Sequence, residues 1–362
     1  MKIGIIGVGR LGLCVAITLR NAGHEVIGVD KNYQLINSLV NGTFNSLEPG
    51  VQNELNDPTN LLFSTDINKV LSDDIEILLS FVATPSKLDG SFSHDAIDEI
   101  LNDLVKKGER EKPTVFVIGS TVMPGYSKTV HEKLKILNYS IIYNPEFIAQ
   151  GSILSDLTAP DQVLIGEFDS QSGDLLEKMY ESFLKNNPVI CRMAPISAEI
   201  TKLATNCFLT TKISFANAIG DLTKVLGGDP DDVLKAIGSD SRIGKKYLNY
   251  GFGFGGPCFP RDNQALISSA KDVHQPLHIA EATIKVNNEH LQFQIDEQCQ
   301  LEKEVHYFDY VSYKPGTDIL EESQQLKLAI ELVKKGKKVV IVNNKLVRNQ
   351  LEKLYPGYFH YK

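Results

Sequence analysis

The stretch IGIIGVGRLG, residues 3–12, decides the fold of the first half of the chain. It begins as an apolar, β-branched run typical of a buried strand and passes directly into glycines at positions 7, 9 and 12. Glycine permits a tight turn and lets a ligand approach the backbone closely. The stretch therefore predicts a strand, a turn and the start of a helix.

The next strand-like run, EVIGVD at residues 25–30, ends in an acidic residue, Asp30. Glycines at a helix N-terminus followed by an acid about twenty residues later indicate a Rossmann-type dinucleotide site. Asp30 favours NAD over NADP because it repels a 2′-phosphate, and Lys31 weakens that preference. The alternative is a glycine-rich turn in an unrelated α/β protein. The expected cofactor contacts are Gly7, Val8, Gly9, Arg10, Leu11, Gly12 and Asp30.

Further strand-like runs alternate with helix-period segments, which predicts a parallel, doubly wound α/β sheet. They are IEILLSFVAT at 75–84, TVFVIGST at 114–121 and SIIYNP at 140–145. From Ser197 to Leu226 the sequence predicts one long amphipathic helix without proline. Gly227 and Gly228 end this helix, Asp229 caps the next one, and Pro230 fits the first position of that helix.

The last section returns to strand and helix patterns and predicts a small terminal α/β domain. Its strand-like runs are VHYFDYVSYK at 305–314 and KKVVIVNN at 337–344. The chain is thus expected to hold a Rossmann-like domain, a helical central domain and a shortened α/β domain. The expected bounds are 1–195, 196–302 and 303–362.

The bulk composition is that of a soluble globular protein. The chain has 362 residues, of which 42% are hydrophobic and 23% charged, and its formal net charge is −8. This acidic balance argues against nucleic acid as a partner. Five widely spaced cysteines without a CxxC pair suit a reducing cytoplasm, and no zinc-type cluster is evident. Without a signal peptide or an apolar run of membrane-spanning length, we expect a cytoplasmic protein with no membrane or metal partner.

A second stretch, GFGFGGPCFPRD at residues 251–262, places Cys258 after a glycine-rich run. A thiol presented in this way is a candidate nucleophile. Judged on the local sequence alone, a buried structural cysteine is an equally good interpretation. Asp262 is suited to orient a water or a lysine, or else to cap a helix that begins near Asn263.

Four polar residues elsewhere are candidates for the chemistry. Lys202 and Asn206 stand four apart on the expected long helix, so both project from one face and suit a substrate hydroxyl and its oxyanion. A solvated face is the alternative. Glu146 and Thr121 each follow a strand, at the edge where open α/β sheets bind ligands. An ordinary loop or capping role is the alternative for both.

Eight motifs in order resemble those of the nucleotide-sugar 6-dehydrogenases, most closely the UDP-glucose 6-dehydrogenases. The resemblance runs from the first glycine motif to about Ser323. The motifs are GVGRLG at 7–12, VATP at 82–85, STVMPG at 120–125, NPEF at 144–147, AEITKLATN at 198–206, SRIG at 241–244, GFGFGGPCFPRD at 251–262 and YKPGTD at 313–318.

The resemblance implies a four-electron oxidation of a sugar C6 alcohol to a carboxylate, with two NAD turnovers and no released aldehyde. Lys202 and Asn206, with a water held by Asp262, would assist the first hydride transfer. Cys258 would trap the aldehyde as a thiohemiacetal that becomes a thioester. The product would be a UDP-glucuronate for surface polysaccharide.

The resemblance also assigns the last step and the ligand contacts. Glu146 would be the base for thioester hydrolysis, and Thr121 would help to place the water. Arg242 would come from the partner subunit of a homodimer, formed through the central domain. Further cofactor contacts would be Thr84, Thr121 and Arg261; the substrate contacts would be Glu146, Phe147, Lys202, Asn206, Arg242, Tyr247, Gly251, Gly255 and Lys314.

Three positions depart from the family's pattern. Gln150 replaces the family's glutamate, Arg261 replaces a lysine and Glu321 replaces an arginine. These changes predict a lower affinity for NAD. The short last domain predicts a less enclosed nucleotide. The alternatives are a GDP-mannose 6-dehydrogenase, a catalytically weakened binding or regulatory paralogue, and a two-electron hydroxyacid dehydrogenase, against which Cys258 argues.

Overall fold

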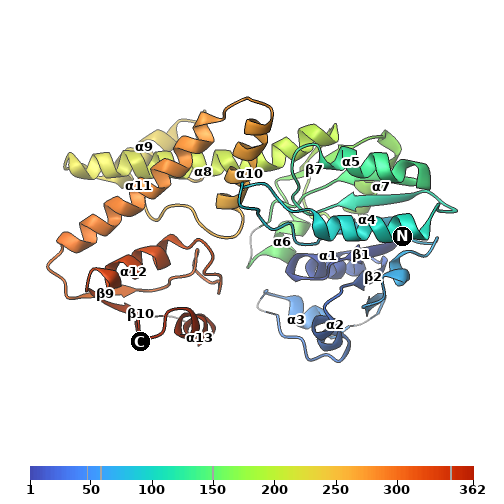
Figure 1. The fold of residues 1–362 in the computed structure, drawn as a ribbon, viewed down its shortest axis with the longest axis horizontal. Helices are drawn as coiled ribbons and strands as arrows, with labels where there is room; N and C mark the ends of the chain where they lie inside the picture. The colour runs from blue at the N-terminus through green and yellow to red at the C-terminus, as the bar shows by residue number, and fades with distance from the viewer. Residues whose placement is uncertain (47, 58, 149–150, 343–344) are drawn as a thin grey trace. The chain divides into compact units, whose positions relative to one another are not determined.

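The computed structural model describes residues 1–46, 48–57, 59–148, 151–342 and 345–362, which form two compact units (Figure 1). The first unit is Met1–Lys202 and the second is Leu203–Lys362. The division falls inside a single helix, α8 (Pro195–Val225). Each unit has a hydrophobic core of its own.

The first unit is built on an eight-stranded sheet of order β3-β2-β1-β4-β5-β6-β7-β8. The bounds are β1 (Lys2–Ile6), β2 (Glu25–Val29), β3 (Leu61–Ser64), β4 (Ile77–Ser80), β5 (Thr114–Ile118), β6 (Tyr139–Tyr143), β7 (Gln162–Glu167) and β8 (Val189–Met193). The predicted Rossmann-type sheet is confirmed, but β7 runs antiparallel to β6. A parallel crossover needs a connection that carries the chain back along the sheet, usually a helix. The helix between these two strands, α6 (Ile153–Thr158), has only 6 residues.

The inner strands β1, β4 and β5 of this sheet are buried on both faces, which explains their continuous apolar sequences. Alternate residues of one strand enter different clusters: Ile3 and Ile5 of β1 lie in one, and Ile6 lies in the other. The first cluster includes residues of α1 (Arg10–Asn21), α6 and α7 (Ser170–Glu181), and the second includes residues of α4 (Asp95–Lys107) and α5 (Tyr126–Leu134). Because β1, β4 and β5 are parallel neighbours, their carboxyl ends lie at one edge of the sheet.

The second unit is helical and ends in a small parallel sheet of order β11-β10-β9. The predicted long helix is confirmed as α8, and the predicted cap of the next helix is confirmed because Asp229 accepts from the N–H of Asp231. The other elements are α9 (Pro230–Ser239), α10 (Phe259–Asp272), α11 (His278–Gln300), β9 (Val305–Phe308), α12 (Gln324–Lys334), β10 (Lys338–Ile341), α13 (Lys345–Leu354) and β11 (His360–Tyr361).

Helix α8 carries a row of exposed apolar side chains in the second unit. Phe208, Phe215 and Leu222 are spaced by seven residues and therefore lie on the same face of the helix. Their exposed fractions are 65%, 49% and 55%. These three residues are called the α8 stripe below.

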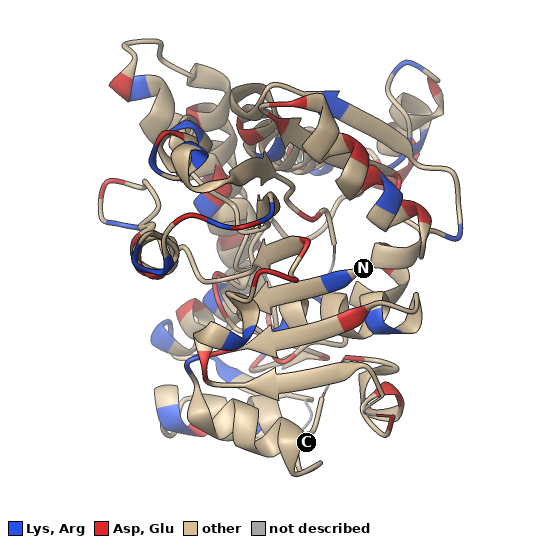
Figure 2. Cartoon of the chain, turned by 90° about the vertical axis from the view of Figure 1, so that its right-hand side faces the viewer, with Lys and Arg blue, Asp and Glu red and all other residues tan. Residues whose placement is uncertain are grey.

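In the view of Figure 2, basic and acidic segments are interspersed along the ribbon. Among the described residues, no helix is both long enough and apolar enough to cross a membrane. The described part of the chain also holds no group of three or more His, Cys, Asp or Glu side chains arranged to bind a metal ion.

Candidate active site

The three glycines of the first turn have different structural roles. Gly7 has a φ of +90°, and a Cβ there would lie 2.4 Å from the carbonyl oxygen of Phe81. A Cβ on Gly12 would lie 1.9 Å from the carbonyl oxygen of Gly7, whereas a Cβ on Gly9 would meet no atom within 4 Å. Gly7 and Gly12 are therefore required by the fold. Gly9 leaves open space before the N-terminus of α1, where a pyrophosphate fits.

Asp30 closes this turn from the end of β2. Its carboxylate accepts from the backbone N–H of Val8 at 3.1 Å and of Asn32 at 2.9 Å. The neighbouring Lys31 pairs with Glu99, with 2.8 Å between Nζ and Oε2. The positive charge of Lys31 is thus partly offset by Glu99, although both side chains are exposed. The open space at Gly9 and the acid at position 30 fit an NAD cofactor.

The ends of β4 and β5 are joined by side-chain hydrogen bonds. The hydroxyl of Thr84 donates to the carbonyl oxygen of Thr121 at 2.8 Å. The hydroxyl of Ser120 accepts from the N–H of Val82 and donates to its carbonyl oxygen, at 2.9 and 2.7 Å. The structure thus brings together Thr84 and Thr121, two of the predicted cofactor contacts, at the carboxyl edge of the sheet.

Glu146 lies beyond the end of β6 in a largely apolar environment. A small cavity beside it is lined by side chains that include Val15, Leu79 and Phe81. Removal from water raises the pKa of Glu146 to about 7, while a hydrogen bond from Tyr180 and the positive charge of Lys202 act in the opposite direction. The Tyr180 hydroxyl lies 3.1 Å from Oε1 of Glu146. A carboxyl group with such a pKa is suited to general base catalysis near neutral pH.

Lys202 and Glu199 on α8 hold two of the loops at this edge. The Lys202 ammonium donates to the backbone carbonyl oxygen of Glu146 at 2.7 Å and lies 4.4 Å from the ring centre of Phe147. Glu199 is fully buried, and its carboxylate accepts from the N–H groups of Gly125 and Ser127 at 2.5 and 2.7 Å. These last contacts cap the N-terminus of α5.

Cys258 lies in the second unit, where it is the N-cap residue of α10 and is exposed. The interpretation as a buried structural cysteine is therefore wrong. A helix N-terminus favours a thiolate over a neutral thiol because the backbone dipoles point their positive ends toward it. The carbonyl oxygen of Cys258 accepts from the N–H of Asp262 at 2.9 Å, in the first turn of the same helix.

Asp262 connects α10 to α8. The residue is 3% exposed, and its Oδ2 accepts from Nδ2 of Asn206 at 2.6 Å. Because α10 already begins at Phe259, the alternative that Asp262 caps a helix starting near Asn263 is wrong. The structure thus joins Asn206 to the side chain of Asp262. Lys202, one helical turn earlier, donates instead to the backbone carbonyl oxygen of Glu146.

The glycines before Cys258 allow close packing against the terminal segment. A Cβ on Gly255 would lie 2.2 Å from the carbonyl oxygen of Glu322. The N–H of Gly256 donates to the carbonyl oxygen of Glu321 at 3.1 Å. A Cβ on Gly256 would lie 2.5 Å from the ring of Tyr313. Glu321 therefore supports the cysteine loop through its backbone.

The remaining predicted ligand contacts also belong to the second unit. Arg242 is exposed and pairs with Asp240 at 2.7 Å, and Lys314 lies 5.9 Å from the ring centre of Tyr313. Tyr247 has a φ of +65° and is 41% exposed.

Arg261 precedes Asp262 on α10, with 3.9 Å between its Nε and Oδ1 of that residue. Gln150 lies outside the described residues. The predicted roles of the site residues in binding and catalysis remain predictions.

Sequence reasoning missed the supporting residues of the site. Tyr180 contacts Glu146 from α7, 34 positions along the chain, and no local pattern connects the two. Glu199 stands three residues before Lys202 on α8, in the same motif. That helical spacing was a usable signal that it also faces the sheet edge.

Comparison with protein families matches both units. Residues 1–184 match the NAD binding domain of the UDP-glucose/GDP-mannose dehydrogenase family, and residues 196–289 match the central domain of the same family.

Relatives and solved structures agree with this match. The chain is 32% identical over 356 residues to a UDP-glucose 6-dehydrogenase of Pseudomonas aeruginosa, covering 94% of the chain and 78% of that protein. It is 31% identical over 354 residues to a GDP-mannose 6-dehydrogenase of Pseudomonas savastanoi, covering 93% and 79%. A UDP-glucose dehydrogenase structure from Pyrobaculum islandicum matches with a TM-score of 0.89 at 28% identity, covering 100% of the chain and 85% of that structure.

Proposed function

Because the chain belongs to the UDP-glucose/GDP-mannose dehydrogenase family, we propose that it oxidises the C6 hydroxyl of UDP-glucose to a carboxylate, forming UDP-glucuronate. The observation that carries this proposal is the exposed thiol of Cys258 at the N-terminus of α10, one turn before the Asn206–Asp262 pair. A two-electron dehydrogenase has no use for such a thiol.

The first unit supplies the cofactor site. The turn at Gly7, Gly9 and Gly12 would hold the pyrophosphate of NAD, and Asp30 would accept from a ribose hydroxyl. NAD, when bound, accepts a hydride in each of the two oxidations. The part played by the chain is to bind, to orient and to move protons.

In the first oxidation, the alcohol loses a hydride from C6 and a proton from its oxygen to give the aldehyde. We assign the handling of that proton to Lys202, Asn206 and a water held by Asp262. An ammonium and an amide stabilise the oxyanion that forms as the hydride departs.

In the second half of the reaction, the sulfur of Cys258 adds to the aldehyde carbon and the carbonyl oxygen gains a proton, forming a thiohemiacetal. This adduct loses a hydride and a proton and becomes a thioester. Glu146 then removes a proton from water, the hydroxide attacks the thioester carbon, and the carbon–sulfur bond breaks to release the carboxylate and regenerate the thiol. Covalent capture would keep the aldehyde bound to the protein between the two oxidations.

GDP-mannose is the alternative substrate. A GDP-mannose 6-dehydrogenase relative is 31% identical to the chain, nearly as similar as the UDP-glucose enzyme. Both substrates present a primary C6 alcohol, so the same chain chemistry would apply to either of them.

A homodimer is the proposed assembly. Three large apolar side chains on one face of a helix form a surface that a second copy of the same helix would cover, and the α8 stripe has this form. In such a dimer, the exposed Arg242 would act on the substrate of the partner subunit.

The stoichiometry of NADH formation tests the proposal. UDP-glucose and GDP-mannose are each supplied in limiting amount with excess NAD, to wild-type protein and to Cys258→Ser. The wild-type protein is expected to form two NADH per molecule of one of the two sugars. The Cys258→Ser variant is expected to form one NADH or less. One NADH per sugar in both proteins would exclude the thioester route, and no NADH with either sugar would favour a binding or regulatory paralogue.

A further inference from the structure

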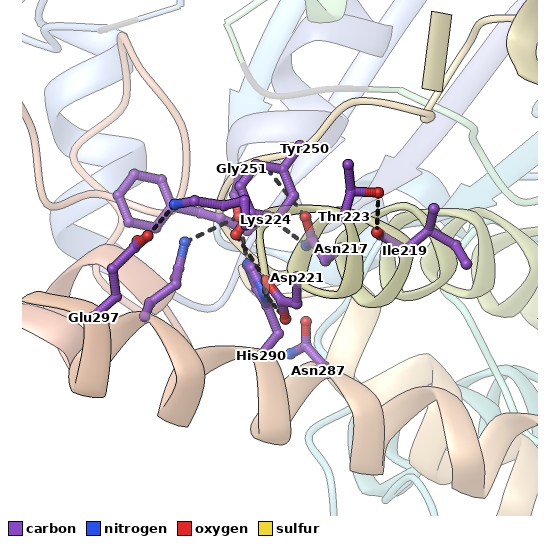
Figure 3. Close-up of polar contacts among 12 residues, drawn as sticks. Asn217, Ile219, Asp221, Thr223, Lys224, Tyr250, Gly251, Asn287, His290 and Glu297 are labelled. Atoms are coloured by element: carbon purple, nitrogen blue, oxygen red, sulfur yellow. Dashed lines mark hydrogen bonds and ion pairs between the residues drawn. The ribbon is translucent and has the colours of Figure 1, made fainter. Parts of the chain in front are cut away.

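The glycine-rich segment before Cys258 is held by polar side chains from two helices (Figure 3). From α8, Asn217 accepts from the N–H of Gly251 at 3.0 Å. From α11, Asn287 accepts from the N–H of Phe254 at 2.8 Å and donates to its carbonyl oxygen at 3.1 Å. The backbone from Gly251 to Phe254 is therefore fixed on both sides by amide groups.

Beside these amides stands a buried histidine with two acceptors. The side chain of His290, on α11, is 1% exposed. Its Nδ1 lies 2.8 Å from Oδ2 of Asp221 on α8, and its Nε2 lies 2.6 Å from the carbonyl oxygen of Gly251. Neither a carboxylate nor a backbone carbonyl has a proton to donate.

With Asp221 ionised, the hydrogen-bond pattern calls for a proton on both ring nitrogens. A neutral imidazole has only one N–H, so one of the two ring nitrogens would be unprotonated. The lone pair of that nitrogen would then face a lone pair of the carboxylate or of the carbonyl oxygen. The doubly protonated ring donates to both and is paired with the negative charge of Asp221. Such charge-assisted hydrogen bonds are the stronger kind.

The other groups around His290 are consistent with this charge. The Tyr250 hydroxyl donates to Oδ1 of Asp221 at 2.7 Å, and burial, together with Asp221, raises the pKa of Tyr250, so it remains a neutral donor. Lys224 and Glu297, further along the two helices, form an ion pair with each other. Asp221 is thus the anion that directly contacts His290.

We propose that His290 is a positively charged positioning residue that, held by Asp221, fixes the carbonyl oxygen of Gly251 and thereby the loop that presents Cys258. Gln294 donates to the same carbonyl oxygen at 3.1 Å but carries no charge. It therefore provides a matched control, because its removal leaves the His290–Asp221 pair intact.

The protonation state is tested by nitrogen NMR of protein labelled at histidine, with the His290 signals assigned by their loss in His290→Gln. At pH 7.5 both ring nitrogens of His290 are expected to be protonated. In Asp221→Asn, the amide can donate to Nδ1, so only Nε2 is expected to keep a proton. An unprotonated ring nitrogen in the wild-type protein would overturn the proposal.

The positioning role is tested by enzyme kinetics. This kinetic test rests on the proposed function. His290→Gln has a single donor nitrogen where the ring has two, so it cannot reach both acceptors. It is expected to lower kcat about 100-fold per folded molecule, because the reacting thiol is then misplaced. Asp221→Asn, which leaves a neutral His290 with a weaker hydrogen bond to Gly251, is expected to lower kcat less than His290→Gln does, and Gln294→Ala is expected to retain most of kcat. Equal kcat in His290→Gln and the wild-type protein would contradict the proposal.

A double variant covers the case in which His290→Gln does not fold, and hydrogen exchange covers the case in which the wild-type protein has no activity. If His290→Gln does not fold because Asp221 is left without its main partner, the double variant Asp221→Asn/His290→Gln removes that charge and takes its place. If the wild-type protein oxidises no nucleotide sugar, the proposed function fails but this inference does not. It is then decided by NMR and by hydrogen exchange of residues 251–256, which is expected to be faster in the His290 variant than in Gln294→Ala. Equal exchange would overturn it.

Discussion

Asn206 donates from Nδ2 to Oδ2 of Asp262 over 2.6 Å, and so joins α8 to α10 one turn after Cys258. The contact is buried on both sides, because the two residues are 7% and 3% exposed. A hydrogen bond to a buried carboxylate is both strong and directional. The orientation of Asp262 relative to Cys258 therefore depends on a residue of a different helix.

Replacing Asn206 by alanine is expected to lower both stability and activity. Asp262 loses the donor that Asn206 supplies, which costs about 1–3 kcal/mol of unfolding free energy for a buried group. We expect kcat to fall about 100-fold, since the reacting groups lose their alignment. The control is Thr210→Val, which breaks the neighbouring contact between α8 and Asn263 of α10. It should lower the melting temperature without a comparable loss of kcat, and equal kcat losses would assign Asn206 a structural role only.

The rate of thioester hydrolysis is expected to rise with pH through about 7, because Glu146 must lose its proton to act as a base and its pKa lies near that value. Tyr180→Phe removes a hydrogen bond that lowers this pKa, so the rising limb of kcat should move to higher pH. Tyr139→Phe, at the other end of β6, should leave it in place. A pH profile of kcat between 5 and 9 measures these shifts. Profiles that coincide for all three proteins would exclude Glu146 as the base.

Alanine substitutions are expected to separate the roles of the three glycines in the first turn. Gly7→Ala and Gly12→Ala place a methyl group against backbone oxygens and should lower the melting temperature. Gly9→Ala meets no protein atom, so the protein should remain stable. Its methyl group should still raise the Kd for NAD about tenfold or more, because a forced contact costs on the order of 1–3 kcal/mol. Thermal melts and NAD titrations measure both effects, and unchanged NAD binding in Gly9→Ala would contradict the predicted site.

Asp30→Ala is expected to reduce the preference for NAD over NADP. The substitution removes the acceptor for the ribose hydroxyl and the repulsion of a 2′-phosphate. Glu99→Gln should have a smaller effect in the same direction, because it frees Lys31 from its ion pair. The ratio of kcat/KM for the two cofactors is the measurement. If the ratio does not change in Asp30→Ala, the cofactor selection lies elsewhere.

Phe215→Glu is expected to yield monomers, because it places a charge in the middle of the α8 stripe. Ile136→Glu, which replaces another exposed apolar residue in the first unit, should leave the assembly unchanged. Light scattering after gel filtration gives the mass of each protein. The proposed assembly also requires the monomeric variant to lose activity along with the Arg242 of the partner subunit. A wild-type protein that is itself monomeric would refute the dimer.

The elements with strong local signals could be predicted from the sequence. The strand, glycine turn and helix at residues 3–21 and the capped start of α9 at Pro230 are confirmed. The edge strands were missed because their apolar runs are short or interrupted. β3 has only 4 residues, and β8 contains Arg192, which pairs with Glu167 on β7.

The candidate site was predictable only in part, because motifs identify reactive groups but not the residues that hold them. Cys258 and Asp262 stand in one motif, whereas the contact of Asp262 with Asn206 crosses 56 positions of sequence. Likewise, His290 reaches the carbonyl oxygen of Gly251 over 39 positions. Such contacts depend on how α8, α10 and α11 pack together, and no spacing within a single element indicates them.

The packing of Gly255 and Gly256 against residues 313–323 also orders events during synthesis. The loop that presents Cys258 takes its final form only when the chain beyond it, to at least Ser323, has left the ribosome and folded back. A nascent chain that ends before this segment therefore has the cysteine but not its support. The loop that presents the nucleophile is therefore completed only after the cofactor-binding unit has been made.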